Sequence, residues 1–212
     1  MDESRSALVT RESLELAATY LARRDNDLAG ILANHGYPPL WRRPSGFPTL
    51  VRIILEQQVS LRSAASMFAR LTNSIHPFEP KRFAELGETH LRSLGVTRQK
   101  AAYMLHLSSS INSGELKLTQ LSRMSDIEAK LTLTRIKGIG SWSADVYLLM
   151  AMRRANIWPA GDLALALAVK DLKRLSIRPG PEDLEELAEN WRPYRAVAAR
   201  MLWQYYLRPK AG

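Results

Sequence analysis

The sequence contains no cysteine among its 212 residues. Disulfide bonds, cysteine-ligated zinc and iron–sulfur clusters are therefore excluded as sources of stability or chemistry. Histidine is also scarce: the four histidines are scattered, and none forms the spaced pair typical of a helical metal site. We expect no metal bound by side chains and no required cofactor.

Long apolar runs are missing as well. No stretch approaches the ~20 consecutive apolar residues that a helix needs to cross a bilayer. The charged residues Asp2, Glu3 and Arg5 lie where a secretion signal would begin its apolar segment. We therefore expect a soluble, cytoplasmic protein, associated with the nucleoid if the source is bacterial.

Acidic residues are outnumbered by basic ones, 21 to 30, which gives a formal net charge of +9. Such an excess predicts a polyanionic partner, with nucleic acid as the first candidate and an anionic membrane as the second. We favour nucleic acid because the arginines are interleaved with tryptophan and tyrosine. Hydrophobic residues make up 46% of the chain, so a well-packed core is expected.

Apolar residues recur at helical spacing along nearly the whole chain, and no segment outside these patterns alternates as a half-buried strand does. The pattern predicts an all-α fold, in which residues 1–212 form a single compact domain of two helical lobes with a central cleft. Caps and breakers place helices at residues 11–24, 26–35, 47–58, 60–75, 81–86, 88–94, 98–112, 162–175, 181–190 and 191–208, with a helix-hairpin-helix at about 125–153. The last of these helices can instead restart after Pro193.

A Gly-X-Gly turn, formed by Gly138, Ile139 and Gly140, lies between the two hairpin helices. Glycine permits positive φ and lets the backbone approach a ligand closely. The turn also exposes N–H groups, from Gly138 to Trp142, at the start of the second helix, where such groups and the helix dipole bind phosphate. Taken alone, the motif is better explained as a cap that ends one helix and starts another.

Asp162 follows the hairpin in the sequence Pro-Ala-Gly-Asp and precedes an apolar helical pattern. Aspartate suits the N-cap position, where the dipole and free N–H groups favour an ionised carboxylate. An ionised carboxylate is what hydrolysis of an N-glycosidic bond needs, because it stabilises an oxocarbenium-like sugar and orients or deprotonates water. The capping role and a catalytic role are therefore compatible.

The string I-K-G-I-G-S-W-S-A-D, which runs from Ile136 to Asp145 and precedes Asp162 in a strongly basic chain, resembles the helix-hairpin-helix (HhH-GPD) DNA glycosylase superfamily. Further similar segments extend the resemblance over roughly residues 46–207. They are ILEQQVS at 54–60, LG and KA at 94–95 and 100–101, and WRPYR at 191–195.

The resemblance implies that Asp162 is the catalytic residue of a DNA glycosylase that flips its target base out of the duplex. Trp142 occupies the place where strand-cutting relatives carry a lysine nucleophile, and an indole forms no Schiff base. This implies a monofunctional enzyme of the 3-methyladenine type, without lyase activity, for N3- and N7-alkylated purines. An indole also attracts a cationic base, worth ~0.5–2 kcal/mol. The implied base pocket consists of Trp142, Trp203, Val146 and Tyr147.

The resemblance also implies how duplex DNA is held. Gln58 corresponds to the side chain that fills the gap left by the flipped base. The implied DNA-binding residues are Gln57, Gln58, Lys137, Gly138, Ile139, Gly140 and Ser141. A structural Na⁺ or K⁺ is implied at the hairpin, with the backbone carbonyls of Thr134, Ile136 and Ile139 as ligands.

A second hypothesis is a non-catalytic helix-hairpin-helix module that only clamps DNA phosphates. Such a clamp needs neither Asp162 nor a set of aromatic residues. The sequence leaves the preferred lesion open among N3-alkyladenine, N7-alkylguanine, 1-methyladenine, ethenoadenine and hypoxanthine. Under either hypothesis the partner is double-stranded DNA, and we expect a monomer.

Overall fold

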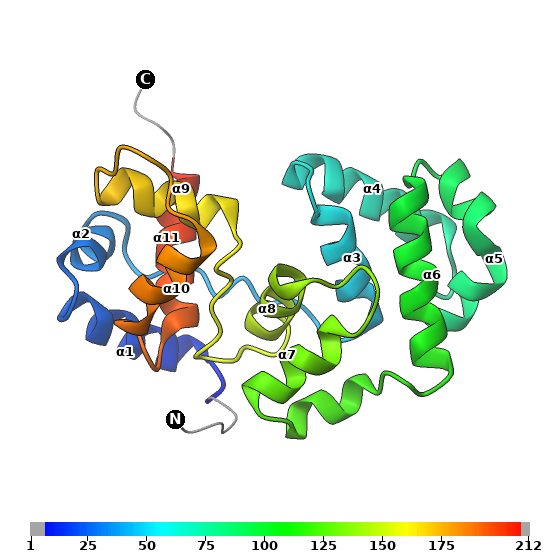
Figure 1. The fold of residues 1–212 in the computed structure, drawn as a ribbon, viewed down its shortest axis with the longest axis horizontal. Coiled ribbons are helices and arrows are strands. Elements are labelled where there is room, and N and C mark those ends of the chain that lie inside the picture. The colour runs from blue at the N-terminus through cyan, green and yellow to red at the C-terminus, as the bar shows by residue number, and fades with distance from the viewer. Residues whose placement is uncertain (1–6, 209–212) are drawn as a thin grey trace. The chain divides into compact units, whose positions relative to one another are not determined.

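The computed structural model describes residues 7–208, which fold into helices (Figure 1). Within that range the only β pairing is an isolated antiparallel bridge between Leu8 and Arg154. The predicted all-α class is confirmed. In chain order the elements are α1 (Arg11–Ala22), α2 (Asn26–His35), α3 (Phe47–Glu56), α4 (Leu61–Ser74), α5 (Pro80–Ser93), α6 (Arg98–Asn112), the 3₁₀ helix η1 (Leu118–Arg123), α7 (Asp126–Thr134), α8 (Ser141–Met150), α9 (Leu163–Leu172), α10 (Pro181–Glu189) and α11 (Arg195–Leu207).

The helix boundaries follow the caps in the sequence. Thr97 accepts a hydrogen bond from the third residue of α6, and Ser125 forms a capping box with Glu128 at the start of α7. Helix α5 bends at Gly87, whose φ of +71° is not helical, which matches the predicted break into two pieces. The last helix begins at Arg195, where the sequence allows it to restart after Pro193, and η1 is too short to produce a periodic signal.

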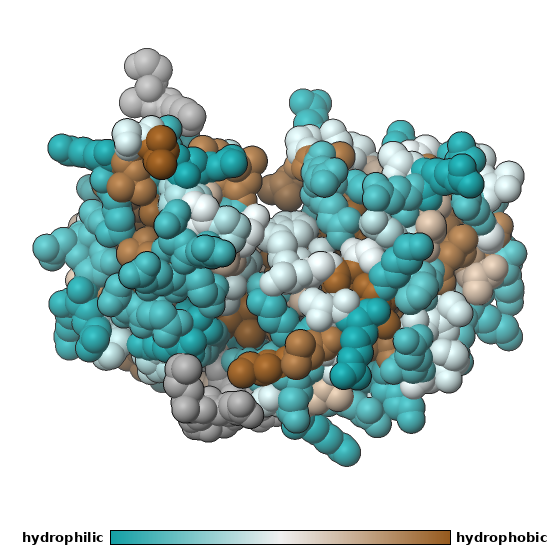
Figure 2. Space-filling view, in the orientation of Figure 1, coloured by the Kyte–Doolittle hydropathy of each residue, from teal (hydrophilic) through white to brown (hydrophobic). Residues whose placement is uncertain are grey.

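The chain divides into two compact units. The first unit contains the residues up to Arg42 together with those from Leu148 onward, and so includes α1, α2 and α9–α11. The second unit, Arg43–Tyr147, contains α3–α7 and most of α8. Hydrophilic residues cover much of the visible face of each unit (Figure 2). None of the helices within residues 7–208 is long and apolar enough to cross a membrane.

Helix α11 forms the core of the first unit. It packs against α9, α2 and α1, and every residue in the range Arg195–Trp203 is buried. Arg200 lies inside this buried stretch and donates to the carbonyls of Leu40, Ala196 and Leu149 at 3.0, 3.0 and 2.8 Å. Burial lowers the pKa of Arg200 to about 10, and the carbonyls replace the water that its guanidinium loses.

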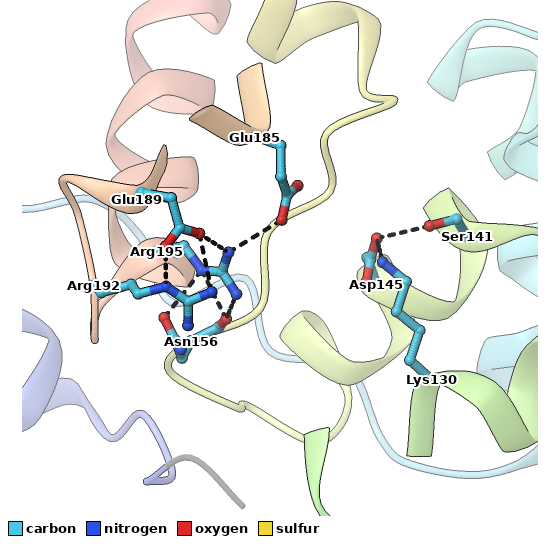
Figure 3. A network of polar contacts seen from close by, with 8 residues as sticks. All are labelled: Lys130, Ser141, Asp145, Asn156, Glu185, Glu189, Arg192 and Arg195. Carbon is cyan, nitrogen blue, oxygen red and sulfur yellow. Dashed lines mark hydrogen bonds and ion pairs between the residues drawn. The ribbon is translucent and has the colours of Figure 1, made fainter. Parts of the chain in front are cut away.

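The helix-hairpin-helix, α7 and α8 with the turn between them, belongs to the second unit except for the last residues of α8. Lys130 of α7 donates to the carboxylate of Asp145 of α8 at 2.8 Å, and the Asp145 side chain is only 3% exposed (Figure 3). The hydroxyl of Ser141, at the start of α8, donates to the same oxygen at 3.4 Å. The pair joins the two helices, because the attraction between the ammonium and a largely buried carboxylate opposes their separation.

Gly138 is the residue of the turn that must be glycine. Its φ is +92°, and a Cβ added there would overlap the ring of Tyr103 on α6. A Cβ added at Gly140 would meet no atom within 4 Å. The hairpin turn therefore packs on α6 through the bare backbone of Gly138.

Replacing Gly138 by alanine is expected to destabilise the protein by about 2 kcal/mol or more, because the new Cβ needs both a positive φ and a displaced Tyr103 ring. The matched control Gly140→Ala is expected to change the free energy of unfolding by less than about 1 kcal/mol, as surface substitutions do. Denaturant unfolding of both variants measures the difference. Equal stabilities for the two variants would contradict the close approach assigned to Gly138.

Candidate active site

Asp162 is the N-cap of α9, as the sequence predicts. One carboxylate oxygen, Oδ1, accepts a hydrogen bond from the backbone N–H of Leu165 at 3.0 Å and another from the indole N–H of Trp203 at 3.1 Å. Asp162 is 9% exposed. The first unit thus brings together two of the predicted site residues, and the carboxylate is fixed by the start of one helix and the core of another.

Trp203 is held on both sides. It lies in the buried stretch of α11 and is 7% exposed. Its ring packs edge-to-face against Trp41, with centroids 6.4 Å apart and ring planes at 73°. Since its indole N–H donates to Asp162, Trp203 helps to hold the carboxylate in position. Trp41, which lies between α2 and α3, extends this aromatic group, although the sequence analysis gave it no role.

The loop that leads to Asp162 is anchored to α11 by Arg195 (Figure 3). The guanidinium donates to the backbone carbonyl and the side-chain oxygen of Asn156 at 2.9–3.1 Å. It also pairs with Glu185 and Glu189, each at 3.2 Å. Burial lowers the pKa of Arg195, while the two glutamates raise it. This network gives the segment after α8 a defined path toward the α9 N-terminus.

The other predicted pocket residues belong to the second unit. Trp142, in the first turn of α8, is half-buried. Val146 and Tyr147 are 3% and 1% exposed. The Tyr147 hydroxyl accepts a hydrogen bond from the backbone N–H of Gly46 at 2.9 Å, and burial raises the pKa of that hydroxyl. Tyr147 therefore anchors the start of α3, and its hydroxyl is already engaged there.

The predicted DNA-binding residues of the hairpin differ in exposure. Lys137, Gly140 and Ser141 are exposed, whereas Ile139 is 3% exposed. The N–H of Ile139 donates to the carbonyl of Ile136 at 2.9 Å, so this amide is used inside the turn. Because the first N–H groups of a helix have no intrahelical acceptor, the start of α8 remains the part of the hairpin suited to an anion.

The side-chain amide of Gln57 is hydrogen-bonded within the second unit. Its amide nitrogen donates to the carbonyl of Gly138 at 2.8 Å and to the hydroxyl of Ser143 at 2.9 Å. The ammonium of Lys100 donates to the carbonyls of Leu55 and Gln57, both at 2.8 Å, and burial lowers the pKa of Lys100. The Gln57 side chain therefore joins the end of α3 to the hairpin, and Lys100 of α6 holds the same helix end.

Gln58 is the exposed residue next to the helix end that Gln57 and Lys100 hold in place. It follows Gln57 directly, and its φ of +56° is in the left-handed region that most side chains avoid. The next residue, Val59, is 45% exposed. A strained, exposed residue next to a fixed helix end is typical of a functional loop.

The structural roles of Lys100, Arg195 and Arg200 were not predicted from the sequence. A signal was present for the two arginines, because each interrupts or borders the apolar run of α11. A charge inside such a run marks either an exposed stripe or a buried hydrogen-bonded group. Within the described part of the chain, no group of three or more His, Asp or Glu residues could hold a metal ion.

Known proteins resemble this chain over most of its length. The DNA-3-methyladenine glycosylase of Bacillus subtilis is 26% identical over 205 residues, which cover 85% of this chain and 68% of that protein. A second Bacillus subtilis relative, YfjP, is 29% identical over 188 residues. The chain spans about two thirds of the length of these two relatives, 64% of YfjP and 68% of the other.

Solved structures share the fold. The DNA-3-methyladenine glycosidase of Bacillus halodurans superimposes with a TM-score of 0.77 at 27% identity, covering 90% of this chain and 89% of that one. The 3-methyladenine DNA glycosylase Mag1 of Schizosaccharomyces pombe, solved in complex with abasic DNA, gives 0.82 at 23% identity, covering 89% and 95%.

A family model decides the assignment. It matches residues 51–193, which include the hairpin, the turn glycines and Asp162. The match begins in α3 and ends just before α11. The chain belongs to the HhH-GPD superfamily of base excision DNA repair proteins.

Proposed function

We propose that this chain is a monofunctional DNA glycosylase that hydrolyses the N-glycosidic bond of alkylated purines, chiefly N3-alkyladenine and N7-alkylguanine, in duplex DNA. The observation that carries the proposal is the carboxylate of Asp162, held at the start of α9 by Leu165 and Trp203. Membership of the HhH-GPD superfamily supports it, as do the names of the relatives from Bacillus subtilis and Bacillus halodurans. A clamp that only bound DNA would not need this carboxylate.

The chemistry that suits Asp162 is stabilisation of a positively charged sugar. As the glycosidic bond breaks, charge develops on the deoxyribose, and a fixed carboxylate lowers the energy of that state. Asp162 also orients, or takes a proton from, the water that attacks the sugar. A purine alkylated at N3 or N7 carries a positive charge and leaves without a protonating acid, so one carboxylate suffices. The target must first be flipped out of the stack.

Trp142 supports the absence of lyase activity. A glycosylase that also cuts the strand needs an amine nucleophile, which an indole does not provide. We propose that Trp142 and Val146 of the second unit and Trp203 of the first each contribute aromatic or apolar surface to recognition of the base. For Tyr147 we propose a contribution from the ring alone, since its hydroxyl binds Gly46.

The hairpin is proposed to grip one DNA strand. The start of α8 offers N–H groups to a phosphate, and the exposed Lys137 adds positive charge beside it. Gly138, Gly140 and Ser141 then act through their backbone, whereas the Ile139 amide stays bonded to Ile136 inside the turn. Gln58 is proposed to enter the space left by the flipped base, where its amide can hydrogen-bond the orphaned partner base.

A monovalent cation at the hairpin fits the residues present. Thr134 is the last residue of α7, so its carbonyl is among those without an intrahelical donor. The Ile136 carbonyl accepts one hydrogen bond, from Ile139, and a carbonyl oxygen has two lone pairs. We propose that these oxygens and that of Ile139 hold Na⁺ or K⁺, which would add positive charge for a DNA phosphate.

The variant Asp162→Asn tests the proposed reaction. Asparagine caps helices as well as aspartate and keeps an oxygen for Leu165 and Trp203, so these two contacts remain while the negative charge is removed. Excision from methylated duplex DNA should fall at least about a hundredfold, with affinity for undamaged duplex retained. Asp171→Asn, which removes an acid further along α9, is the control and should keep full activity. An active Asp162→Asn protein would exclude Asp162 as the catalytic residue.

Borohydride trapping tests the monofunctional assignment. Because Trp142 replaces the amine, reduction during turnover should yield no covalent DNA–protein adduct, and the abasic product strand should stay uncut. A glycosylase with a lysine nucleophile, treated in parallel, shows that trapping works. Detection of an adduct with this protein would overturn the assignment.

Salt dependence tests the hairpin grip. Lys137→Ala should reduce the slope of log K against log salt for undamaged duplex by about 0.9, the value for one phosphate contact. Lys81→Ala, which removes an exposed lysine from α5, should leave the slope unchanged. Fluorescence anisotropy over a salt series gives both slopes. If the two variants behave alike, the hairpin lysine makes no specific phosphate contact.

A further inference from the structure

The segment between α2 and Trp41 is tied to the core helix of the first unit. The side-chain amide of Gln204 on α11 donates to the carbonyls of His35 and Tyr37 at 2.9 and 3.4 Å. Arg200, one turn earlier on the same helix, donates to the carbonyl of Leu40 at 3.0 Å. The peptide that precedes Trp41 is therefore held by a fully buried guanidinium.

Trp41 itself has a strained backbone. Its φ is +41°, a left-handed conformation that is uncommon for any residue except glycine and unfavourable for a bulky one. Such strain persists only where the surroundings determine the conformation, and it is concentrated at functional sites. Here the surroundings are the Arg200 hydrogen bond on one side and the Trp203 ring on the other.

The strained backbone directs the indole toward the candidate active site. The Trp41 ring packs against Trp203, and Trp203 donates to Asp162. The two ring planes are inclined at 73°, so a flat molecule can lie parallel to one ring and not to both. Trp203 is buried and committed to the carboxylate, whereas Trp41 is only half-buried. The ring of Trp41 is therefore the better of the two for stacking.

We propose that Trp41 is a base-recognition residue, whose indole stacks on the flipped purine beside Asp162. This inference rests on the proposed glycosylase function and names a residue that sets its specificity. The electron-rich face of an indole favours electron-poor and cationic rings, so the substrate class is purines carrying an alkyl group on a ring nitrogen. Arg200 is a positioning residue, since it acts through the Leu40–Trp41 peptide.

The variant Trp41→Gly separates recognition from folding. Glycine accepts a φ of +41° without strain, so removal of the ring should leave the thermal unfolding temperature close to that of the wild type. Single-turnover release of N3-methyladenine and N7-methylguanine from methylated duplex DNA should nevertheless slow by about tenfold or more. Trp41→Phe keeps an aromatic face and should remain within a few-fold of wild type.

Tyr37→Leu is the matched control. It removes another aromatic ring from the same segment, whose hydroxyl contacts Thr19 and not Trp203. The backbone carbonyl of residue 37 still accepts the hydrogen bond from Gln204 in this variant. This variant should release bases at the wild-type rate. If Trp41→Gly also does so, the inference is wrong. If both variants lose activity together with thermal stability, Trp41 has only a packing role and the inference is again wrong.

The wild-type reaction separates this inference from the proposed function. If wild-type protein releases no alkylated base, the proposed function fails and the role of Trp41 fails with it. If wild-type protein releases the bases and Trp41→Gly matches it, only the role of Trp41 fails. Slow release by Trp41→Gly, with stability retained and Trp41→Phe active, supports the assignment.

Discussion

One oxygen of Asp162 accepts two hydrogen bonds, and the functional account of this protein depends on them. The bond from Leu165 starts α9, and the bond from Trp203 joins that helix end to α11. The carboxylate is thus part of the packing of the first unit and does not move as a free side chain. Two arginines of α11 hold the chain segments beside this site. Arg200 binds the segment before Trp41, and Arg195 binds the loop that leads to Asp162. Preorganisation of this kind lets a single carboxylate stabilise charge as it develops.

In the second unit, side chains fix the backbone of the hairpin turn and of the α3 end in a comparable way. Gly138 packs its bare backbone on Tyr103, Gln57 binds the Gly138 carbonyl, and Lys100 binds the end of α3. The hairpin and the loop that carries Gln58 are therefore joined through side chains that themselves are only partly exposed. The half-buried groups maintain the geometry of the hairpin, and the proposed contact with a phosphate falls to the exposed groups.

Much of this was predictable because it is encoded locally. Asp162 caps the helix that it was expected to cap, and Thr97 and Ser125 cap helices at the predicted starts, since a cap needs only a side chain and the N–H groups two or three residues later. The contacts made across the fold left no comparable signal. The Gln57 amide bonds residues more than eighty positions away, and the Arg200 bond to Leu40 spans a still longer stretch of chain. Periodicity and motif spacing do not report such pairs.

The most direct test of the central claim is chromatography of the free bases that the purified protein releases from methylated duplex DNA. We expect a peak of N3-methyladenine, with N7-methylguanine beside it, and intact DNA strands carrying abasic sites. No free base, together with salt-sensitive binding of the same duplex, would contradict the account and leave the chain as a DNA-binding module.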